Sequence, residues 1–147
     1  MPCAAKGRKM PPERDGDRPE RWLKQADHDI EDAKFCSEGG RHALACFLAQ
    51  QAAEKTVTAY LYGRGADDVW GHSLSDLCED AMAFDPGFDA LKPTAALLDK
   101  YYESTRYPTG LPGGIPAEAY DRDDAVRAVQ IANEVLGFVQ PRMELPD

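Results

Sequence analysis

The chain has little of what several large protein classes require. Its 147 residues include no apolar run close to the roughly 20 residues that a membrane-spanning helix needs. Residues 1–21 have no apolar centre of the kind that a signal peptide carries. We therefore expect a cytoplasmic protein that does not enter the membrane. Strand-like alternation of apolar and polar residues is also missing, which argues against a β fold.

Cysteine and histidine are scarce. The four cysteines include no C-x-x-C pair, so we predict free, mostly buried thiols rather than a disulfide framework or a zinc site. The three histidines do not combine with acidic residues into a metal-binding face. No P-loop, dinucleotide-binding glycine pattern or nucleophile elbow is present. We therefore expect no metal, no cofactor and no catalytic residues.

Positive charge is in deficit, because the net charge is -9. Residues 1–21 hold six of the 17 Lys and Arg and four of the 26 Asp and Glu, so the rest of the chain carries a charge of -11. An acidic domain of this kind repels the phosphates of duplex nucleic acid. Any anion site must therefore be a local concentration of arginine and lysine.

What the sequence does contain is helical periodicity. Apolar residues recur at spacings of three and four in five segments that end at glycine or proline. The predicted helices cover about residues 20–36, 41–62, 73–84, 88–105 and 121–140. We expect Ser73 to cap the third helix and Asp121 or Asp123 to cap the fifth. We also expect Pro93 to lie in the first turn of the fourth helix and Pro141 to end the fifth.

These helices predict an all-α domain, an up-and-down antiparallel bundle of four to five helices over residues 19–141. Residues 1–18, which are basic and rich in proline, are expected to form a disordered tail, and residues 142–147 a C-terminal tail. The apolar faces of the second and fifth helices are wider than one core needs, so we expect a homodimer. Residues 106–120 contain three prolines and three glycines and are expected to form a long functional loop without helical periodicity.

A polar stripe follows the second predicted helix. It consists of Gln50, Gln51, Glu54, Lys55 and Thr58, at spacings of three and four in an otherwise apolar segment. Buried polar groups need partners, and three arrangements would supply them. Glu54 and Lys55 pair with Arg106 and with other helices, or Gln51 and Lys55 line a groove that takes a phosphate. In the third arrangement the stripe faces the partner of a dimer.

The segment after the fourth predicted helix carries the best candidates for ligand contact. The Arg106 guanidinium can hold a phosphate through two hydrogen bonds, or it pairs with Glu103 or caps the helix. Tyr107 can stack on a base or pack within the loop. Tyr102 and Tyr101 extend this aromatic cluster.

His72 precedes the cap of the third helix. A general base at this position would need a nucleophile and an orienting carboxylate, and the sequence shows no such set. The alternative role is a ring that hydrogen-bonds to nearby backbone. We expect the other two histidines, His28 and His42, to lie on solvated helix faces.

Four motifs in order give the chain a family resemblance. They are Trp22-Leu23 with Ala26, QQAAEK at 50–55, His72-Ser73-Leu74 and RYP at 106–108. In this order they resemble the HEPN family, small helical domains of prokaryotes that also occur at the end of a large animal chaperone-like protein. The resemblance covers about residues 20–140.

The resemblance implies an antiparallel bundle, usually dimeric, with a link to nucleotides or RNA. Many HEPN proteins are encoded beside a minimal nucleotidyltransferase and form a toxin–antitoxin pair with it. One branch cleaves RNA without a metal, through an arginine and a histidine a few residues later. Here no histidine follows Arg106, and the Arg64–His72 pair of similar spacing lies after the second helix. The resemblance therefore carries over the fold and a nucleotide site, but not the ribonuclease centre.

We predict a non-catalytic HEPN-type domain that binds a nucleotide or RNA, or a nucleotidyltransferase partner. The expected nucleotide-binding residues are Arg106, Tyr107, Lys55, Gln51, Tyr102 and His72. Two alternatives stay open. The first is a metal-independent ribonuclease that uses Arg64 and His72. The second is a pure protein-interaction module whose acidic surface and fifth-helix face bind another protein.

Overall fold

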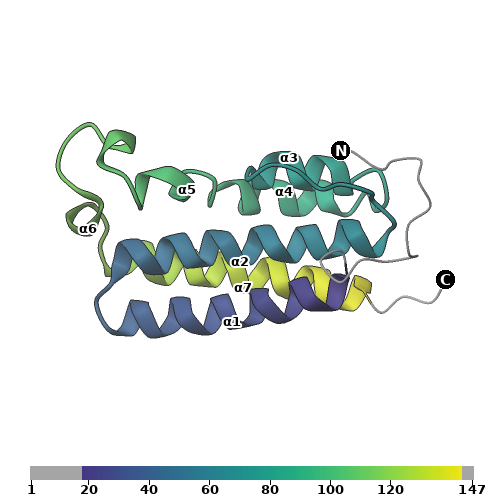
Figure 1. The fold of residues 1–147 in the computed structure, drawn as a ribbon, viewed down its shortest axis with the longest axis horizontal. Coiled ribbons are helices and arrows are strands. Elements are labelled where there is room, and N and C mark those ends of the chain that lie inside the picture. Colours follow the sequence, from purple (N-terminus) through teal and green to yellow (C-terminus); the bar gives the residue numbers. More distant parts are fainter. Residues whose placement is uncertain (1–17, 144–147) are drawn as a thin grey trace.

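Three long helices form the body of the protein. The computed structural model describes residues 18–143. The predicted tails at 1–18 and 142–147, with Cys3, lie outside these residues except for Arg18, Arg142 and Met143, and the last two belong to a helix. The long helices, which lie side by side in Figure 1, are α1 (Pro19–Glu38), α2 (His42–Gly63) and α7 (Arg122–Met143). Along the other side of α2 lie α3 (Leu74–Ala81), α4 (Phe88–Ala96) and α5 (Tyr101–Ser104). The predicted all-α helical bundle is confirmed.

Helix α2 is the central element. It contacts α1, α7, α3, α5 and α6, so most of its surface is inside the protein. Its fully buried small residues include Ala45, Ala49, Ala52 and Ala53. Because alanine side chains are short, the neighbouring helices can approach α2 closely. The polar side chains of α2 must therefore find partners among the elements packed around it.

Two helix starts follow the predicted capping chemistry. Ser73 Oγ accepts a hydrogen bond from the Asp76 backbone N–H at 3.2 Å, which confirms Ser73 as the N-cap of α3. At the start of α7 the cap is Asp121 rather than Asp123. Asp121 Oδ1 accepts from the Asp124 N–H, and Asp124 Oδ2 accepts from the Asp121 N–H, both at 3.0 Å. The hydrogen bond from the Asp124 backbone N–H is the main cause that lowers the pKa of Asp121.

The prediction of one helix over 88–105 is wrong. The chain forms α4 and α5, which are separated by a tighter turn in which backbone N–H groups bond to carbonyls three residues back, as from Leu98 to Ala95. This turn brings the Asp99 carboxylate to the start of α3. Pro93 lies inside α4, past the first turn where we expected it. Its side chain is exposed, and α4 accommodates it although a proline nitrogen cannot donate the usual helical hydrogen bond.

Proline positions also account for two further corrections. Helix α7 continues to Met143, past Pro141, because the last turn is held by Arg142, whose Nη1 donates to the Phe138 carbonyl at 2.7 Å. The 106–120 segment contains a 3₁₀ turn, η2 (Pro108–Gly110), and a short helix, α6 (Pro116–Ala119). Both begin at a proline, whose fixed φ suits the first helical position.

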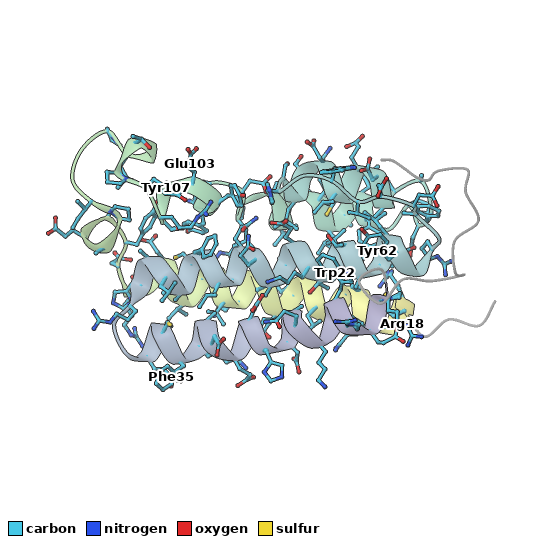
Figure 2. All side chains as sticks on the ribbon, viewed as in Figure 1. Arg18, Trp22, Phe35, Tyr62, Glu103 and Tyr107 are labelled. Carbon is cyan, nitrogen blue, oxygen red and sulfur yellow. The ribbon has the colours of Figure 1, made fainter. Side chains whose placement is uncertain are left out.

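The wide apolar face of α7 is covered within the chain. Ile131 and Val135 are buried, and Phe138 packs edge-on against Phe88 of α4 with ring centroids 4.9 Å apart. The face on which we based the homodimer is therefore used inside one copy, and the homodimer stays a prediction. Figure 2 shows Phe35 of α1 pointing away from the bundle, and this ring is 79% exposed. No described helix has an apolar stretch long enough to cross a membrane.

Candidate functional site

The polar stripe of α2 faces the segment that leads into α3. Gln50, fully buried, donates from Nε2 to the His72 carbonyl at 3.0 Å and to Glu54 Oε1 at 3.2 Å. Gln51 Nε2 donates to Gln50 Oε1 at 2.7 Å and to Glu54 Oε1 at 3.2 Å. Three residues of the stripe, Gln50, Gln51 and Glu54, thus form a connected hydrogen-bond network. It fixes the position of His72 relative to α2.

His72 has an acidic partner that the sequence did not reveal. Its Nδ1 lies 2.9 Å from Glu54 Oε2, and the His72 side chain is 56% exposed while that of Glu54 is 14% exposed. With Nδ1 held by the carboxylate, Nε2 is the ring nitrogen left for a ligand or a proton. The ring also stacks on Tyr102, with centroids 4.3 Å apart. Our interpretation of a ring bonded to nearby backbone is wrong, because the partner is the Glu54 side chain.

Asp99 holds the segment that carries His72. Its carboxylate accepts hydrogen bonds from the Leu74 N–H at 2.6 Å, the Ser75 N–H at 3.2 Å and Ser73 Oγ at 3.2 Å. These bonds satisfy free N–H groups at the start of α3. Sequence reasoning missed Asp99 because it is about 25 residues away from the groups it binds.

Arg106 lies among three aromatic rings, one of which is Tyr102. The Arg106 Cζ is 4.6 Å from the ring centroids of Phe47 and Tyr102 and 5.0 Å from that of Tyr107. Its Nε donates to the Tyr102 carbonyl at 2.8 Å, so it helps to cap α5. Glu103 points away from α2 in Figure 2. Among the described residues no carboxylate is within ion-pair distance of Arg106, so its terminal nitrogens can bind an external anion.

Lys55 has a different partner from the rest of the predicted set. Its Nζ is 2.5 Å from Asp29 Oδ2 of α1, and Asp29 also accepts from Gln25 Nε2 at 2.8 Å. The structure therefore directs Lys55 toward α1, and it does not place Lys55 beside Arg106. Of the six predicted residues, the contacts join five into one surface along α2 and α5. The five are Arg106, Tyr107, Tyr102, His72 and Gln51.

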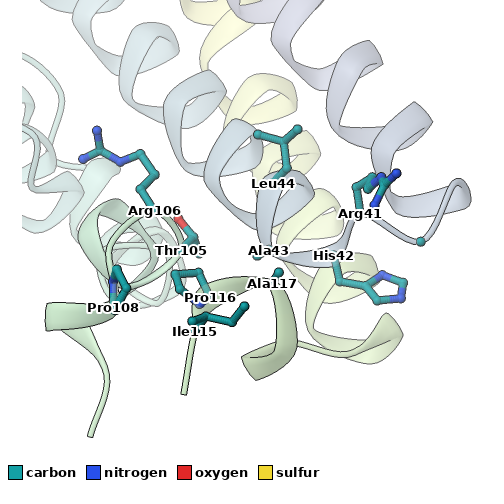
Figure 3. A pocket seen from close by; sticks show the side chains of 11 residues that line it. Arg41, His42, Ala43, Leu44, Thr105, Arg106, Pro108, Ile115, Pro116 and Ala117 are labelled. Atoms are coloured by element: carbon teal, nitrogen blue, oxygen red, sulfur yellow. The ribbon is translucent and has the colours of Figure 1, made fainter. Parts of the chain in front are cut away.

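A pocket of about 450 Å³ continues this surface toward the start of α2. Figure 3 shows Ile115, Pro116 and Ala117 on one side of it, Leu44 of α2 on the other, and Arg106 at its edge. The remaining lining residues are Gly40, Arg41, His42, Ala43, Thr105 and Pro108. We expected His42 to be solvated, but its Nδ1 is buried and makes no hydrogen bond to any described residue.

The site contains no set of metal ligands. Across residues 18–143 no group of three or more His, Cys, Asp or Glu side chains is placed to hold a metal ion. What the site offers is a guanidinium, a histidine fixed by a carboxylate, and aromatic faces. These groups suit the recognition of a phosphate next to a base or a sugar.

Comparison with known proteins places the chain in a family. The profile of the HEPN domain matches residues 19–142. The chain belongs to the HEPN family. Three solved structures are similar to this protein over 86% of its chain. They are TT1696 from Thermus thermophilus, ST0689, described as an archaeal HEPN homologue, and TM0613, a HEPN domain protein from Thermotoga maritima.

The three similar structures support the assignment at the level of fold and sequence. Sequence identity to this HEPN domain is 39% for TT1696, 37% for ST0689 and 32% for TM0613, with TM-scores of 0.81, 0.72 and 0.69. The alignments cover 98%, 98% and 99% of those chains, so nearly all of each solved chain aligns with this protein. No curated protein matches the sequence.

Proposed function

We propose that this HEPN domain binds a nucleotide or an RNA segment, with Arg106 as the phosphate contact. The observation that carries the proposal is the set of groups around the Arg106 guanidinium. Three aromatic rings hold it in place, and no carboxylate among the described residues neutralises it. In a protein with a net charge of -9, an unpaired arginine of this kind is suited to an anionic ligand.

The test is a calorimetric titration of the full chain with ATP, GTP and a short RNA. We expect Arg106→Ala to weaken binding about tenfold or more, which corresponds to about 1.4 kcal/mol. Arg64→Ala is the matched control, because Arg64 also lies over an aromatic ring, that of Tyr60 at 5.7 Å, but at the other end of α2. Absence of binding by the parent protein, or equal effects of both substitutions, would reject the proposal.

A metal-independent ribonuclease is the second candidate, and the Glu54–His72 contact favours it. The pair would differ from the Arg64–His72 pair considered from the sequence, because Arg106 is the arginine that shares the Tyr102 ring with His72. His72 Nε2 would take the proton of a ribose 2′-hydroxyl, whose oxygen attacks the phosphorus. The bond to the 5′-oxygen would break, and that oxygen would take a proton from water. Arg106 would stabilise the charge that develops on the phosphate.

A cleavage assay in EDTA separates binding from catalysis. If the domain is a ribonuclease, we expect RNA to be cut, and both His72→Ala and Glu54→Gln to slow cleavage by about 10²-fold or more. His28→Ala, which changes an exposed histidine on α1, serves as the control. Intact RNA after long incubation would leave the non-catalytic binding function.

Association with other proteins is part of the proposal. We propose a homodimer and a complex with a minimal nucleotidyltransferase, as in a toxin–antitoxin pair. The exposed Phe35 ring and the acidic charge of the chain support contacts of this kind. Light scattering at micromolar concentration tests the homodimer, and a monomeric mass would reject it. Size-exclusion chromatography with the purified nucleotidyltransferase tests the complex. A stable protein complex without any nucleotide affinity would instead favour a pure interaction module.

A further inference from the structure

The pocket at the start of α2 is continuous with the Arg106 surface. Arg106 is one of its lining residues, and Phe47, which lies under the guanidinium, is one turn along α2 from Ala43 and Leu44 in the pocket wall. A ligand held by Arg106 through a phosphate can therefore extend directly into the pocket. The inference that follows rests on the proposed function.

The walls of the pocket are mostly apolar and partly open to solvent. Leu44 and Ile115 are 47% and 46% exposed, and Pro116 and Ala117 complete the side that α6 contributes (Figure 3). A volume of about 450 Å³ is within the range of small-molecule sites. A flat ring system placed between these side chains would remove their apolar surface from water.

The polar groups of the pocket are two arginine side chains and the backbone N–H groups at the start of α2. The charged residues that line it are Arg41 and Arg106, with no acidic residue, although acids outnumber bases in the chain. The first turn of α2 has no side-chain cap, so its leading N–H groups are available as donors. A ligand with hydrogen-bonding atoms at its edge can satisfy these groups, whereas an alkyl chain cannot.

We propose that the pocket holds the base of the nucleotide whose phosphate lies at Arg106. The base would place its faces against Leu44 and Ile115 and its polar edge toward the start of α2. The site would then recognise a nucleoside phosphate as a unit, rather than a phosphate alone. An unpaired base is required, because a base within a duplex cannot enter.

The experiment compares three phosphate ligands that present different groups to the pocket. Adenosine 5′-monophosphate, ribose 5-phosphate and hexyl phosphate are titrated into the full chain by calorimetry. We expect adenosine 5′-monophosphate to bind about tenfold more tightly than either of the other two. Ala117→Trp places a large ring at the exposed wall of the pocket and should remove this advantage. Ala119→Trp, on the same short helix but outside the pocket lining, should retain it.

The outcomes separate this inference from the proposed function. If ribose 5-phosphate binds as tightly as adenosine 5′-monophosphate, and Arg106→Ala weakens both, the base pocket is rejected and phosphate binding by Arg106 stands. If hexyl phosphate equals adenosine 5′-monophosphate, the pocket accepts any apolar group and the assignment to a base is wrong. If no ligand binds, both fail together. Leu44→Ala, which enlarges the pocket rather than filling it, should reduce the advantage of the base several-fold and guards against a folding defect of Ala117→Trp.

Discussion

The position of His72 is set by side chains that are far from it in the sequence. Glu54 orients the ring, Gln50 holds the carbonyl, and Asp99 holds the following backbone N–H groups. Each of these contacts satisfies a donor or an acceptor that folding would otherwise leave unpaired. A single exposed imidazole is thus fixed between two helices and a turn, which is what a binding or catalytic histidine requires.

Lys55 and Asp29 provide a test of stability at the residue scale. Asp29 is 5% exposed, and removal of Lys55 would leave its carboxylate without its cationic partner. We expect Lys55→Met to lower the free energy of unfolding by about 1–3 kcal/mol and to leave nucleotide affinity unchanged. Urea denaturation measures the first effect and calorimetry the second. Lys34→Met removes the exposed Lys34–Glu31 pair and should change stability by less than about 1 kcal/mol.

The role of a single residue can be predicted from the sequence when its contacts are made within its own turn or when its type is unusual for its surroundings. Ser73 is predictable as a cap because capping involves only its own turn, and Arg106 stands out because it lies beside tyrosines in a loop. Lys55 has the spacing from Gln51 that one helix face requires, which is why we expected it in the same groove. Spacing does not show which neighbouring helix meets that face, and here α1 supplies Asp29 as the partner.

At the scale of elements, the segment between α5 and α7 is held in place at Gly110. A Cβ at this position would lie 2.8 Å from the Ser104 Cα, which is backbone and cannot move aside easily. We expect Gly110→Ala to displace the turn that follows Arg106, to lower stability by about 1–3 kcal/mol and to weaken nucleotide binding several-fold. Gly113→Ala is the control, since nothing lies within 4 Å of its Cβ. Thermal unfolding and calorimetry on both variants check the prediction, and equal behaviour of the two would contradict it.

The turn before α4 is joined to the end of α7 by an ion pair that responds to acid. Asp85 Oδ2 accepts from Arg142 Nε at 2.9 Å, and Asp85 Oδ1 accepts from the Gly87 N–H at 2.8 Å. The Gly87 hydrogen bond is the main cause that lowers the pKa of Asp85 below 3.8, and Arg142 adds to it. A lowered pKa contributes stability above pH 3.8 that is lost as the pH falls through the value in the folded protein.

Asp85→Asn should therefore reduce the pH dependence of stability in acid. We expect the variant to be less stable than the parent at about pH 6 and to show a smaller further loss between about pH 4 and pH 2. Denaturant titrations across this range measure the difference. Asp89→Asn, at an exposed position in the first turn of α4, serves as the control. An unchanged pH profile in Asp85→Asn would show that the ion pair does not couple to folding.

The elements themselves are largely predictable, and the exceptions have physical reasons. The long helices α1, α2 and α7 follow from apolar periodicity that tertiary packing reinforces. The break between α4 and α5 contains no proline or glycine from which it could have been predicted. It follows from the tertiary contact of Asp99 with α3, which no local pattern encodes. The expectation that a proline begins or ends a helix fails at Pro93 and Pro141, because both lie inside helices at exposed positions.

At the scale of the whole molecule, the reactivity of the cysteine thiols measures how often the bundle opens. Cys46 and Cys78 are fully buried, and burial raises the pKa of each thiol to about 12. Cys36 is half-buried, and burial also raises its pKa. Since the thiolate is the reactive form, the two buried cysteines should react only when the bundle opens.

Alkylation of a Cys3→Ala variant with iodoacetamide at about pH 8 tests this expectation. We expect Cys36 to be modified first in the folded protein, and Cys46 and Cys78 only in denaturant. Intact-mass and peptide analysis identify the modified positions. Modification of Cys46 as fast as that of Cys36 in the native protein would mean that the bundle opens far more often than its packing implies.

The pocket, the Arg106 guanidinium and the His72 ring each contact a different residue of α2, so this one continuous helix sets the spacing between them. Leu44 lines the pocket, Phe47 lies under the Arg106 guanidinium and Glu54 pairs with His72. At a rise of about 1.5 Å per residue, the roughly ten residues from Leu44 to Glu54 span about 15 Å. The helix alone sets this distance between the three α2 residues. The affinity of a chain-like ligand should therefore rise with its length until it spans the distance from Leu44 to Glu54. Further units should add no affinity.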